Sequence, residues 1–333
     1  MRYLVTGSAG FIGFHLASYL SSQGHQVIGL DNYADYYSPE LKKLRAEKLQ
    51  SSYNVITHEL DLIIKPKLIK FIEQNNFDSI FHLAAQPGVR LKSHEYSKYH
   101  DSNIIAFTNI LEATFNCNVR NFLYASSSSV YGNSTKEKYS ESEYGLNPIS
   151  YYGATKLANE LLASRFAKTS NTRVRGLRFF TVYGPWGRPD MAYLRLVNAC
   201  LSGKDFNLYG SRDTLRDFTF VDDVVRMVAS LNLELSNHSS GFADVVNIGG
   251  GQPESLLSMM KIIESETTNK LKIKYHEKNN NDVNRTYADS SYLESLIGMK
   301  PLISIQNGLP EVVSWVKTKI VLENLDTWIE SVD

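Results

Sequence analysis

The sequence predicts an α/β protein built on a doubly wound parallel sheet, with a smaller α/β substrate lobe towards the C-terminus. Short apolar runs alternate with stretches of helical periodicity through the first half of the chain, which is typical of a parallel sheet covered on both faces. From about residue 184 the pattern loosens, and loops with glycine and proline separate short mixed segments. This change of pattern predicts the second lobe.

The first strand is predicted at residues 3–5, and a helix follows because Ile12, Leu16 and Leu20 recur every four residues before Gly24 ends the pattern. Further apolar runs predict strands at residues 26–30, 54–57, 79–83, 121–124 and 174–179. A later run, residues 244–248, precedes three glycines and is expected to return to the main sheet. The expected domains are therefore residues 1–183 with a returning segment of about 240–262, and a discontinuous lobe made mainly of residues 184–333.

Composition argues against several functions. The 333 residues contain 35 Lys+Arg and 35 Asp+Glu, so no nucleic-acid partner and no membrane surface is expected. No apolar run reaches the roughly 20 residues that span a bilayer, and the N-terminus lacks the apolar stretch of a signal peptide. Cys117 and Cys200 have no metal or redox spacing. We therefore expect a cytoplasmic enzyme without a metal.

Gly7, Gly10 and Gly13 form a G-x-x-G-x-x-G sequence that follows the first strand and opens the first helix. Glycine lets the backbone turn tightly and approach a pyrophosphate, which the helix N-terminus stabilises through free N–H groups and its dipole. The bare string is a weak signal, but its position at a strand–turn–helix junction is a strong one. The sequence therefore predicts a Rossmann-type domain that binds a dinucleotide.

Asp31 ends the second predicted strand. A carboxylate at this place accepts hydrogen bonds from the adenosine ribose and repels a 2′-phosphate, so NAD is expected rather than NADP. The alternative is that Asp31 is a capping or turn aspartate. Asp61 is expected near the adenine amino group. The predicted NAD-binding residues are Gly7, Gly10, Phe11, Ile12, Gly13, Asp31, Asn32, Asp61, Leu62, Leu83, Ala84, Ala85, Tyr152 and Lys156.

Tyr152 and Lys156 are four residues apart, so on a helix their side chains share one face. A phenol has a pKa near ~10 in water, which is too high for a base at neutral pH. A neighbouring ammonium, a positively charged cofactor ring and a hydrogen bond from Ser127 would lower it. This spacing also occurs in solvated surface pairs, but the adjacent cofactor site favours catalysis. Tyr152, Lys156 and Ser127 are the predicted catalytic residues.

With these residues placed, the chain resembles the extended short-chain dehydrogenase/reductase family, specifically its NAD-dependent nucleotide-sugar epimerases, over essentially its whole length. The matching segments are residues 6–13, 82–86, 126–132, 152–156 and 216–223. The segments 31–37, 85–90 and 177–192 are most similar to UDP-glucuronate 4-epimerases. Two departures are Pro87, where a small residue is usual, and Asn280-Asn281-Asp282, where a Pro-Gly-Asp turn is common.

The resemblance implies an isomerase that interconverts UDP-glucuronate and UDP-galacturonate through a 4-keto sugar, with NAD bound throughout. Tyr152 would remove the C4 hydroxyl proton, Ser127 would hydrogen-bond the C4 oxygen, and Lys156 would lower the pKa of Tyr152 and hold the nicotinamide ribose. Ser128 and Ser129 stand just before Val130, where related dehydratases and decarboxylases carry an acid. Loss of water or CO₂ is therefore disfavoured.

The resemblance also implies how the substrate is held. The serines and Thr181 would bind the sugar carboxylate, with Arg188 neutralising it nearby. Arg90 is expected on the carboxylate side of the substrate. Arg216 is expected at the diphosphate, or else in a structural ion pair with Asp217 or Asp222. Gln86 is expected to contact the sugar or to satisfy backbone groups. The predicted substrate-binding residues are Gln86, Arg90, Ser128, Ser129, Thr181, Arg188 and Arg216.

Several alternatives stay open. The chain could be a 4-epimerase of a neutral UDP-hexose or UDP-N-acetylhexosamine, a UDP-glucuronate decarboxylase or nucleotide-sugar dehydratase, or an NAD-sensing protein without catalysis. The family implies a homodimer through helices around residues 103–116 and 152–168, and the substrate class suggests polysaccharide biosynthesis. The apolar residues Leu157, Leu161 and Leu162 would look the same if they packed within a monomer.

Overall fold

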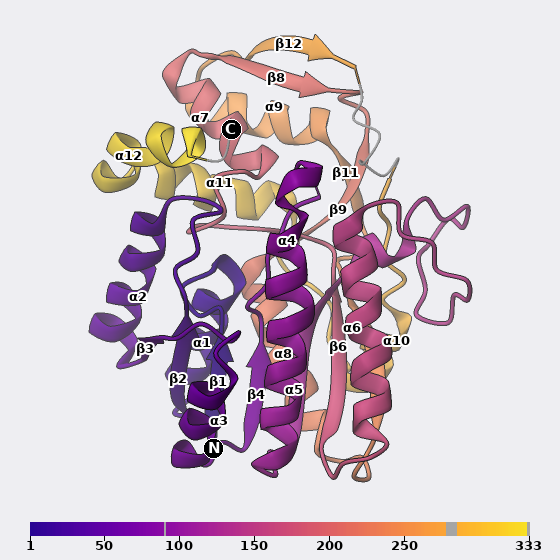
Figure 1. The fold of residues 1–333 in the computed structure, drawn as a ribbon. Helices are drawn as coiled ribbons and strands as arrows, with labels where there is room; N and C mark the ends of the chain where they lie inside the picture. The colour runs from indigo at the N-terminus through magenta and orange to yellow at the C-terminus, as the bar shows by residue number, and fades with distance from the viewer. Residues whose placement is uncertain (90, 278–284, 332–333) are drawn as a thin grey trace.

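A parallel sheet of seven strands forms the centre of the molecule, with the order β10-β6-β5-β4-β1-β2-β3 (Figure 1). The computed structural model describes residues 1–89, 91–277 and 285–331. The strands of this sheet are β1 (Arg2–Thr6), β2 (Gln26–Asp31), β3 (Ile56–Glu59), β4 (Ser79–His82), β5 (Asn121–Ser127), β6 (Arg173–Phe179) and β10 (Ala243–Ile248). All neighbouring pairs run parallel. The predicted fold class is confirmed.

Helices cover both faces of the sheet, which explains why its strands read as continuous apolar runs (Figure 1). Successive side chains of a strand point to opposite faces, so Tyr3 and Val5 of β1 lie in one core and Leu4 in the other. The first core is closed by α1 (Phe11–Ser22), α2 (Pro39–Tyr53), α8 (Val221–Leu235) and α10 (Ser291–Ile297). The second is closed by α3 (Lys65–Asn75), α5 (Ala106–Asn116) and α6 (Tyr151–Ala167).

The smaller lobe lies at the carboxyl ends of these strands, at the top of Figure 1, and has a core of its own around Met259, Leu309 and Trp328. Its strands β8 and β12 pair in parallel, and β11-β9-β7 forms a separate three-stranded sheet. The lobe contains β7 (Thr181–Tyr183), α7 (Ala192–Ser202), β8 (Asp205–Tyr209), β9 (Leu215–Phe220), β11 (Pro253–Ser255), α9 (Leu256–Thr267), β12 (Lys272–His276), α11 (Ile305–Val316) and α12 (Lys319–Glu330).

Two strands differ from the prediction by two or more residues at a boundary. The strand expected at residues 54–57 begins at Ile56, because Asn54 adopts a left-handed conformation (φ 54°) and ends α2. The strand expected at residues 121–124 continues to Ser127, because its pairing with β6 extends as far as Ser127 and Phe179. The longer strand places the serine run at the carboxyl end of the sheet.

The chain also returns to the main sheet earlier than the expected segment of about 240–262. Helix α8 already packs on the sheet through Val224, Val228 and Leu231, before β10 joins the edge beside β6. Helix α9, which begins inside the expected segment, packs into the lobe through Met259 and Ile263. Amphipathic periodicity identifies the buried face of such a helix but not the core that receives it.

Candidate active site

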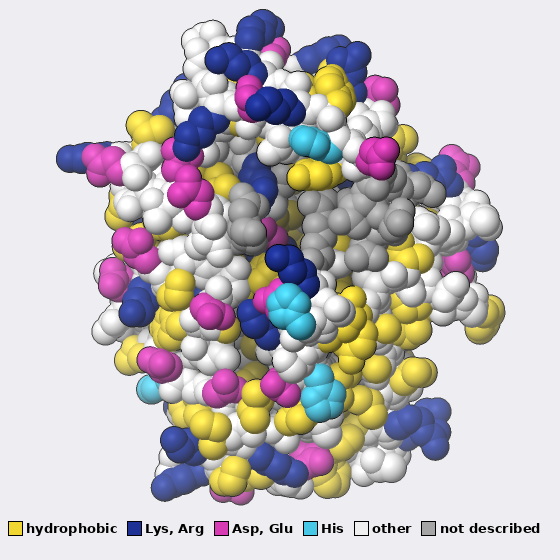
Figure 2. Space-filling view, turned by 45° about the horizontal axis from the view of Figure 1, so that its top comes forward, with side chains coloured by type: hydrophobic (Ala, Val, Ile, Leu, Met, Phe, Trp, Pro, Cys, Tyr) yellow, Lys and Arg dark blue, Asp and Glu magenta, His cyan; other side chains and the backbone are white. Residues whose placement is uncertain are grey.

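A cleft of about 1500 Å³ opens between the carboxyl ends of the main strands and the lobe. Figure 2, in which the top of Figure 1 comes forward, shows a hollow near the middle of this face with basic side chains beside it. The strand order reverses between β1 and β4, so the loops that follow these two strands diverge. Ligands of doubly wound sheets bind in such a crevice.

Every predicted site residue that the structure describes lines this cleft. They are Gly7, Gly10, Phe11, Ile12, Gly13, Asp31, Asn32, Asp61, Leu62, Leu83, Ala84, Ala85, Gln86, Ser127, Ser128, Ser129, Tyr152, Lys156, Thr181, Arg188 and Arg216. Arg90 and the stretch Asn280-Asn281-Asp282 lie outside the described residues. Within the described ranges, no group of three or more His, Cys, Asp or Glu residues could hold a metal ion, and no helix is long and apolar enough to cross a membrane.

The glycine turn leaves no room for side chains. A Cβ on Gly13 would lie 2.0 Å from the carbonyl oxygen of Gly7, and one on Gly7 would lie 2.7 Å from the amide nitrogen of Ala84. Gly10 caps α1 and has no side chain, so the N–H groups of the first turn, from Phe11 onward, stay available to a ligand. The turn therefore fits the pyrophosphate of a dinucleotide.

Asp31 is buried and has the turn role considered for it, while its binding of the ribose stays a prediction. Its carboxylate accepts hydrogen bonds from the N–H groups of Ala9 at 3.0 Å and Tyr33 at 2.9 Å, which fixes the glycine turn against the end of β2. Burial raises the pKa of Asp31, while Lys42 opposes that rise. A carboxylate offers about four acceptor sites, so a ribose diol can still bind. Nearby, Asn32 donates to Asp61 at 3.1 Å, which brings two more predicted cofactor residues together.

Tyr152 and Lys156 project from the first turns of α6, whose N-terminus is capped by Ser150. Lys156 is buried, and its Nζ donates to the carbonyl oxygen of Ala125 at 2.9 Å. The same Nζ lies 5.8 Å from the ring centroid of Tyr152. Burial lowers the pKa of Lys156 from 10.5 to about 7. The predicted pair is therefore held on one face of the helix and directed into the cleft.

The pKa of Tyr152 departs from the expectation that neighbouring groups would lower it. Burial raises this pKa above its ordinary value, and the positive charge of Arg188 and the Ser127 side chain offset the rise only in part. The cation that lowers it is thus Arg188 from the far side of the cleft. The groups of the chain that act on Tyr152 leave its pKa raised, so its role as a base at neutral pH stays a prediction.

The serine run is held from behind by a buried polar cluster. Ser126 donates to Glu160 of α6 at 2.5 Å, and Arg178 of β6 binds the same carboxylate with two hydrogen bonds of 2.9 and 2.7 Å. At the front, Ser127 Oγ accepts the N–H of Ser129 at 3.1 Å and caps the 3₁₀ turn η3 (Ser128–Tyr131). The acid nearest the run is therefore engaged by an arginine beneath it.

Arg188, which is expected to neutralise a substrate carboxylate nearby, is itself paired with an acid of the chain. It binds Asp190 with two hydrogen bonds of 3.0 and 2.7 Å, and the Tyr36 hydroxyl also donates to Asp190 at 3.3 Å. Burial raises the pKa of Asp190, but Arg188 more than offsets this and holds it below its ordinary value. Asp190 was not among the predicted residues, because a carboxylate two residues from an arginine is common on any surface.

The remaining predicted residues take different positions. Gln86 is buried and its amide donates to the carbonyl of Pro87 at 3.1 Å, as expected of a residue that satisfies backbone groups. Thr181 begins β7 beside the cleft. Arg216 donates to the carbonyl of Leu215 at 3.0 Å, whereas the carboxylate of Asp217 accepts the backbone N–H groups of Gly250, Gly251 and Ala288.

Asn103 supports the site without lining the cleft, and the sequence prediction missed it. It lies in a short π-helix, η2 (His100–Ile105), and is buried. It accepts the backbone N–H of Gln86 at 2.8 Å and donates to Thr155 of α6 at 3.1 Å, so it joins the loop after β4 to the catalytic helix. A π-helical turn is often found at functional sites, but no sequence pattern identifies it. An asparagine inside a helix was the one available signal.

Comparisons with known proteins show which family the chain is similar to. The model of the NAD dependent epimerase/dehydratase family matches residues 3–249. Protein CapI of Staphylococcus aureus is 40% identical over 328 residues, covering 95% of this chain and 98% of CapI. A probable UDP-glucuronate 4-epimerase of Rhizobium meliloti is 36% identical, covering 95% and 96%. The structure of UDP-glucuronic acid 4-epimerase from Bacillus cereus with UDP-glucuronic acid and NAD superposes with a TM-score of 0.87 at 31% identity, covering 95% and 99%.

Proposed function

The chain belongs to the NAD-dependent epimerase/dehydratase family, and we propose that it is an isomerase that interconverts UDP-glucuronate and UDP-galacturonate at C4. Its cofactor is NAD. The observation that carries the proposal is the meeting of Tyr152, Lys156 and Ser127 at the cofactor cleft, with only serines at positions 126–129. A phenol base beside an oxidising cofactor can remove a proton and a hydride from one sugar carbon and its hydroxyl. Elimination would need a second acid, and the serine run contains none.

The proposed reaction conserves all atoms. Tyr152 as phenolate takes the proton of the C4 hydroxyl and later returns it, while Ser127 hydrogen-bonds the C4 oxygen and Lys156 holds the nicotinamide ribose. NAD supplies the hydride acceptor and then the donor at C4. Because the 4-keto sugar turns over between the two transfers, the hydride returns to the opposite face. The product is an isomer of the substrate, and the cofactor ends as it began.

The 4-keto uronate is a β-keto acid, which loses CO₂ when its carboxylate aligns with the carbonyl π system. We propose that Ser128, Ser129 and Thr181 hold the carboxylate out of this alignment. All three line the cleft, and Ser129 is fixed at the start of η3 through its N–H bond to Ser127. Arg188 supplies positive charge nearby, in a position set by Asp190.

A product assay tests this function. The purified protein is incubated with UDP-glucuronate and the nucleotides are separated by chromatography, with Tyr152→Phe as the inactive control. A UDP-galacturonate peak is the expected result. A UDP-pentose peak would identify a decarboxylase, and turnover of UDP-glucose in preference to UDP-glucuronate would identify an epimerase of neutral sugars. Either outcome contradicts the proposal.

The carboxylate contacts have their own test. Thr181→Ala and Arg188→Ala are each expected to lower kcat/KM for UDP-glucuronate by roughly tenfold or more, because a hydrogen bond to a charged group is lost. With the 4-keto sugar less restrained, the fraction of UDP-pentose among the products should rise. If both variants keep the kinetics and product ratio of the parent, the carboxylate is held elsewhere.

We propose that two copies of the chain associate through α5 and α6. These helices expose Phe115, Leu161 and Leu162, with Leu161 65% exposed, whereas Leu157 packs within the monomer against the cluster around Val130. Leu161→Lys is expected to convert a dimer to a monomer in light scattering. Leu233→Lys, at a leucine of α8 that is 57% exposed, is the control and should leave the dimer intact. We place the enzyme in the cytoplasm, where nucleotide sugars are its expected substrates.

A further inference from the structure

Arg45 of α2 is completely buried, and it contacts neutral oxygen atoms. Its guanidinium donates to the carbonyls of Ala9 at 3.0 Å, of Trp186 at 3.0 and 2.7 Å, and of Gly187 at 2.9 Å, and to the hydroxyl of Tyr37 at 2.6 Å. Among the residues that the structure describes, no carboxylate lies within ion-pair distance of it. A buried charge without a counter-ion is costly, so this arrangement calls for an explanation.

One end of the Arg45 contact set is the cofactor turn. Ala9 lies between Gly7 and Gly10, and its N–H is bound by Asp31 while its carbonyl is bound by Arg45. The turn is thereby held from both sides by groups of opposite charge. Burial raises the pKa of Asp31, and the charge of Arg45 is one of the smaller influences that oppose this rise.

The other end is the loop that carries Arg188. Trp186 has φ 56°, a left-handed conformation that is strained for a bulky residue. Its carbonyl accepts two of the Arg45 hydrogen bonds, and its ring packs 5.5 Å from Phe14 of α1 and 5.6 Å from Trp315 of the lobe. Strained backbone persists where surrounding contacts determine it. Arg45 makes those contacts two residues before Arg188.

We propose that Arg45 is a positioning residue that links the two ligand sites, because a single rigid guanidinium holds the cofactor turn and the substrate loop at a fixed separation. The proposal rests on the proposed function for the identity of the substrate. The hydride passes between a cofactor held by the glycine turn and a sugar held by the loop of Arg188. The distance between the turn and the loop therefore affects the rate directly. Arg45 itself does not line the cleft, so it acts through the turn and the loop that it binds.

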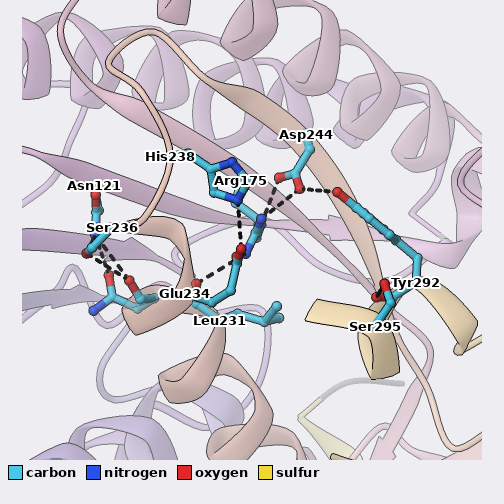
Figure 3. A network of polar contacts seen from close by, with 10 residues as sticks. Asn121, Arg175, Leu231, Glu234, Ser236, His238, Asp244, Tyr292 and Ser295 are labelled. Carbon is cyan, nitrogen blue, oxygen red and sulfur yellow. Dashed lines mark hydrogen bonds and ion pairs between the residues drawn. The ribbon is translucent and has the colours of Figure 1, made fainter. Parts of the chain in front are cut away.

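A purely structural role is the alternative, and the chain provides a matched control. Arg175 of β6 is equally buried, but it forms ion pairs with Asp244 at 2.7 Å and Glu234 at 2.5 Å (Figure 3). It lies in the core under α8 and β10, away from the residues that line the cleft. Replacing each arginine by methionine removes the same groups and retains a long side chain.

The test compares Arg45→Met, Arg45→Lys and Arg175→Met, each measured below its own unfolding temperature. NAD content is measured in the purified protein, UDP affinity by calorimetry, and kcat and KM with UDP-glucuronate. Arg45→Met is expected to lose NAD content and UDP affinity together and to lower kcat/KM by roughly tenfold to a hundredfold. Arg45→Lys should remain nearly as impaired, since a point charge cannot bridge both loops as a planar fork does.

Arg175→Met is expected to unfold at lower temperature while its NAD content, UDP affinity and kcat stay within about twofold of the parent. The inference is overturned if Arg45→Met binds both ligands like the parent. Full recovery in Arg45→Lys also overturns it, because charge alone would then suffice. A parent that binds NAD and UDP but does not act on UDP-glucuronate would refute the proposed function and leave the binding comparison valid.

Discussion

The Arg175 cluster and the cleft are both rich in buried polar groups, but their charged side chains are paired to different extents. Around Arg175, Asp244 and Glu234 bind the guanidinium, Tyr292 donates to Asp244 at 2.9 Å and His238 contacts Glu234 at 2.7 Å (Figure 3). The cluster ties α8, β10 and α10 to β6. The cation Arg175 has two anions within the chain.

At the cleft Arg188 has Asp190 as its partner, but in the part of the chain that the structure describes two other buried cations in or behind the cleft have no carboxylate within ion-pair distance. Lys156 is buried against a carbonyl, and the charge of Arg45 is surrounded by neutral oxygens. The backbone is also irregular here, with the left-handed Trp186 and the π-helix around Asn103. A region that only stabilises the fold pairs its polar groups with one another, whereas a region that binds a ligand keeps polar groups that the ligand complements.

The largest expected difference between the two regions follows from removing one phenolic oxygen from each. Tyr152→Phe is expected to lower kcat by about 10²–10⁴-fold, because the phenol is the proposed base. Tyr292→Phe removes only the hydroxyl that binds Asp244 and should leave kcat unchanged. Steady-state rates with UDP-glucuronate measure both. Equal effects of the two substitutions would contradict the assignment of Tyr152.

Adding one methyl group to a glycine is expected to have different effects in the two regions. In Gly13→Ala the new Cβ meets the backbone of Gly7, which cannot move without opening the turn, so NAD content should fall severely. In Gly176→Ala the Cβ meets the Tyr124 hydroxyl at 2.6 Å and a methyl of Val245 at 3.0 Å, both side-chain atoms. Overpacking of this kind costs about 1–3 kcal/mol.

For this pair, NAD content is measured by extraction and stability by urea unfolding. The alanine at position 13 should show the loss of cofactor, and the alanine at position 176 the loss of stability with cofactor retained. An NAD content at parental level in Gly13→Ala would mean that the turn does not close against the ligand as the geometry indicates.

The Arg175 cluster predicts a variant that loses stability alone. Asp244→Asn leaves Arg175 without its two-point partner, and breaking a buried pair in this way costs about 3–5 kcal/mol. The residual pair with Glu234, which is partly exposed, places the expected loss near the lower end. Calorimetry measures the loss, and kcat at moderate temperature should match the parent. A fall in kcat without a fall in stability would be evidence against the separation of the two regions.

The last expected effect is a pH dependence of stability in the NAD-free protein. The pKa of Lys156 is about 7 when folded, against an ordinary 10.5, so between these values the unfolded chain binds the extra proton. Stability of the parent relative to Lys156→Met should therefore rise as pH increases from about 7 to about 10. Urea unfolding of both proteins across this range measures the difference. A difference that falls with rising pH would contradict the sign.

Much of this architecture could be predicted from local sequence. Apolar runs located the strands, and the glycine turn with Asp31 located the cofactor cleft, because both depend on neighbouring residues. The family resemblance added the substrate. All the predicted site residues in the described part of the chain line one cleft, although their individual roles stay predictions.

The parts that could not be predicted depend on contacts between distant residues. Arg45 reaches Trp186 and Gly187 across 141 and 142 positions, and nothing in the sequence of α2 marks it from other helical arginines. The pairing of Arg188 with Asp190, the raised pKa of Tyr152 and the core assignment of α8 likewise follow from tertiary burial. Local patterns carry no information on burial at that range.

The chain passes between the main sheet and the lobe more than once, since α8 and β10 return to the sheet and α10 does so again after β12. A new substrate specificity therefore cannot be transplanted by exchanging one contiguous piece with a relative. Recombination at a single crossover would join a lobe to elements of a foreign core and separate Arg45 from the loop it holds. In this architecture, specificity is expected to diversify through point substitutions in the loops around the cleft.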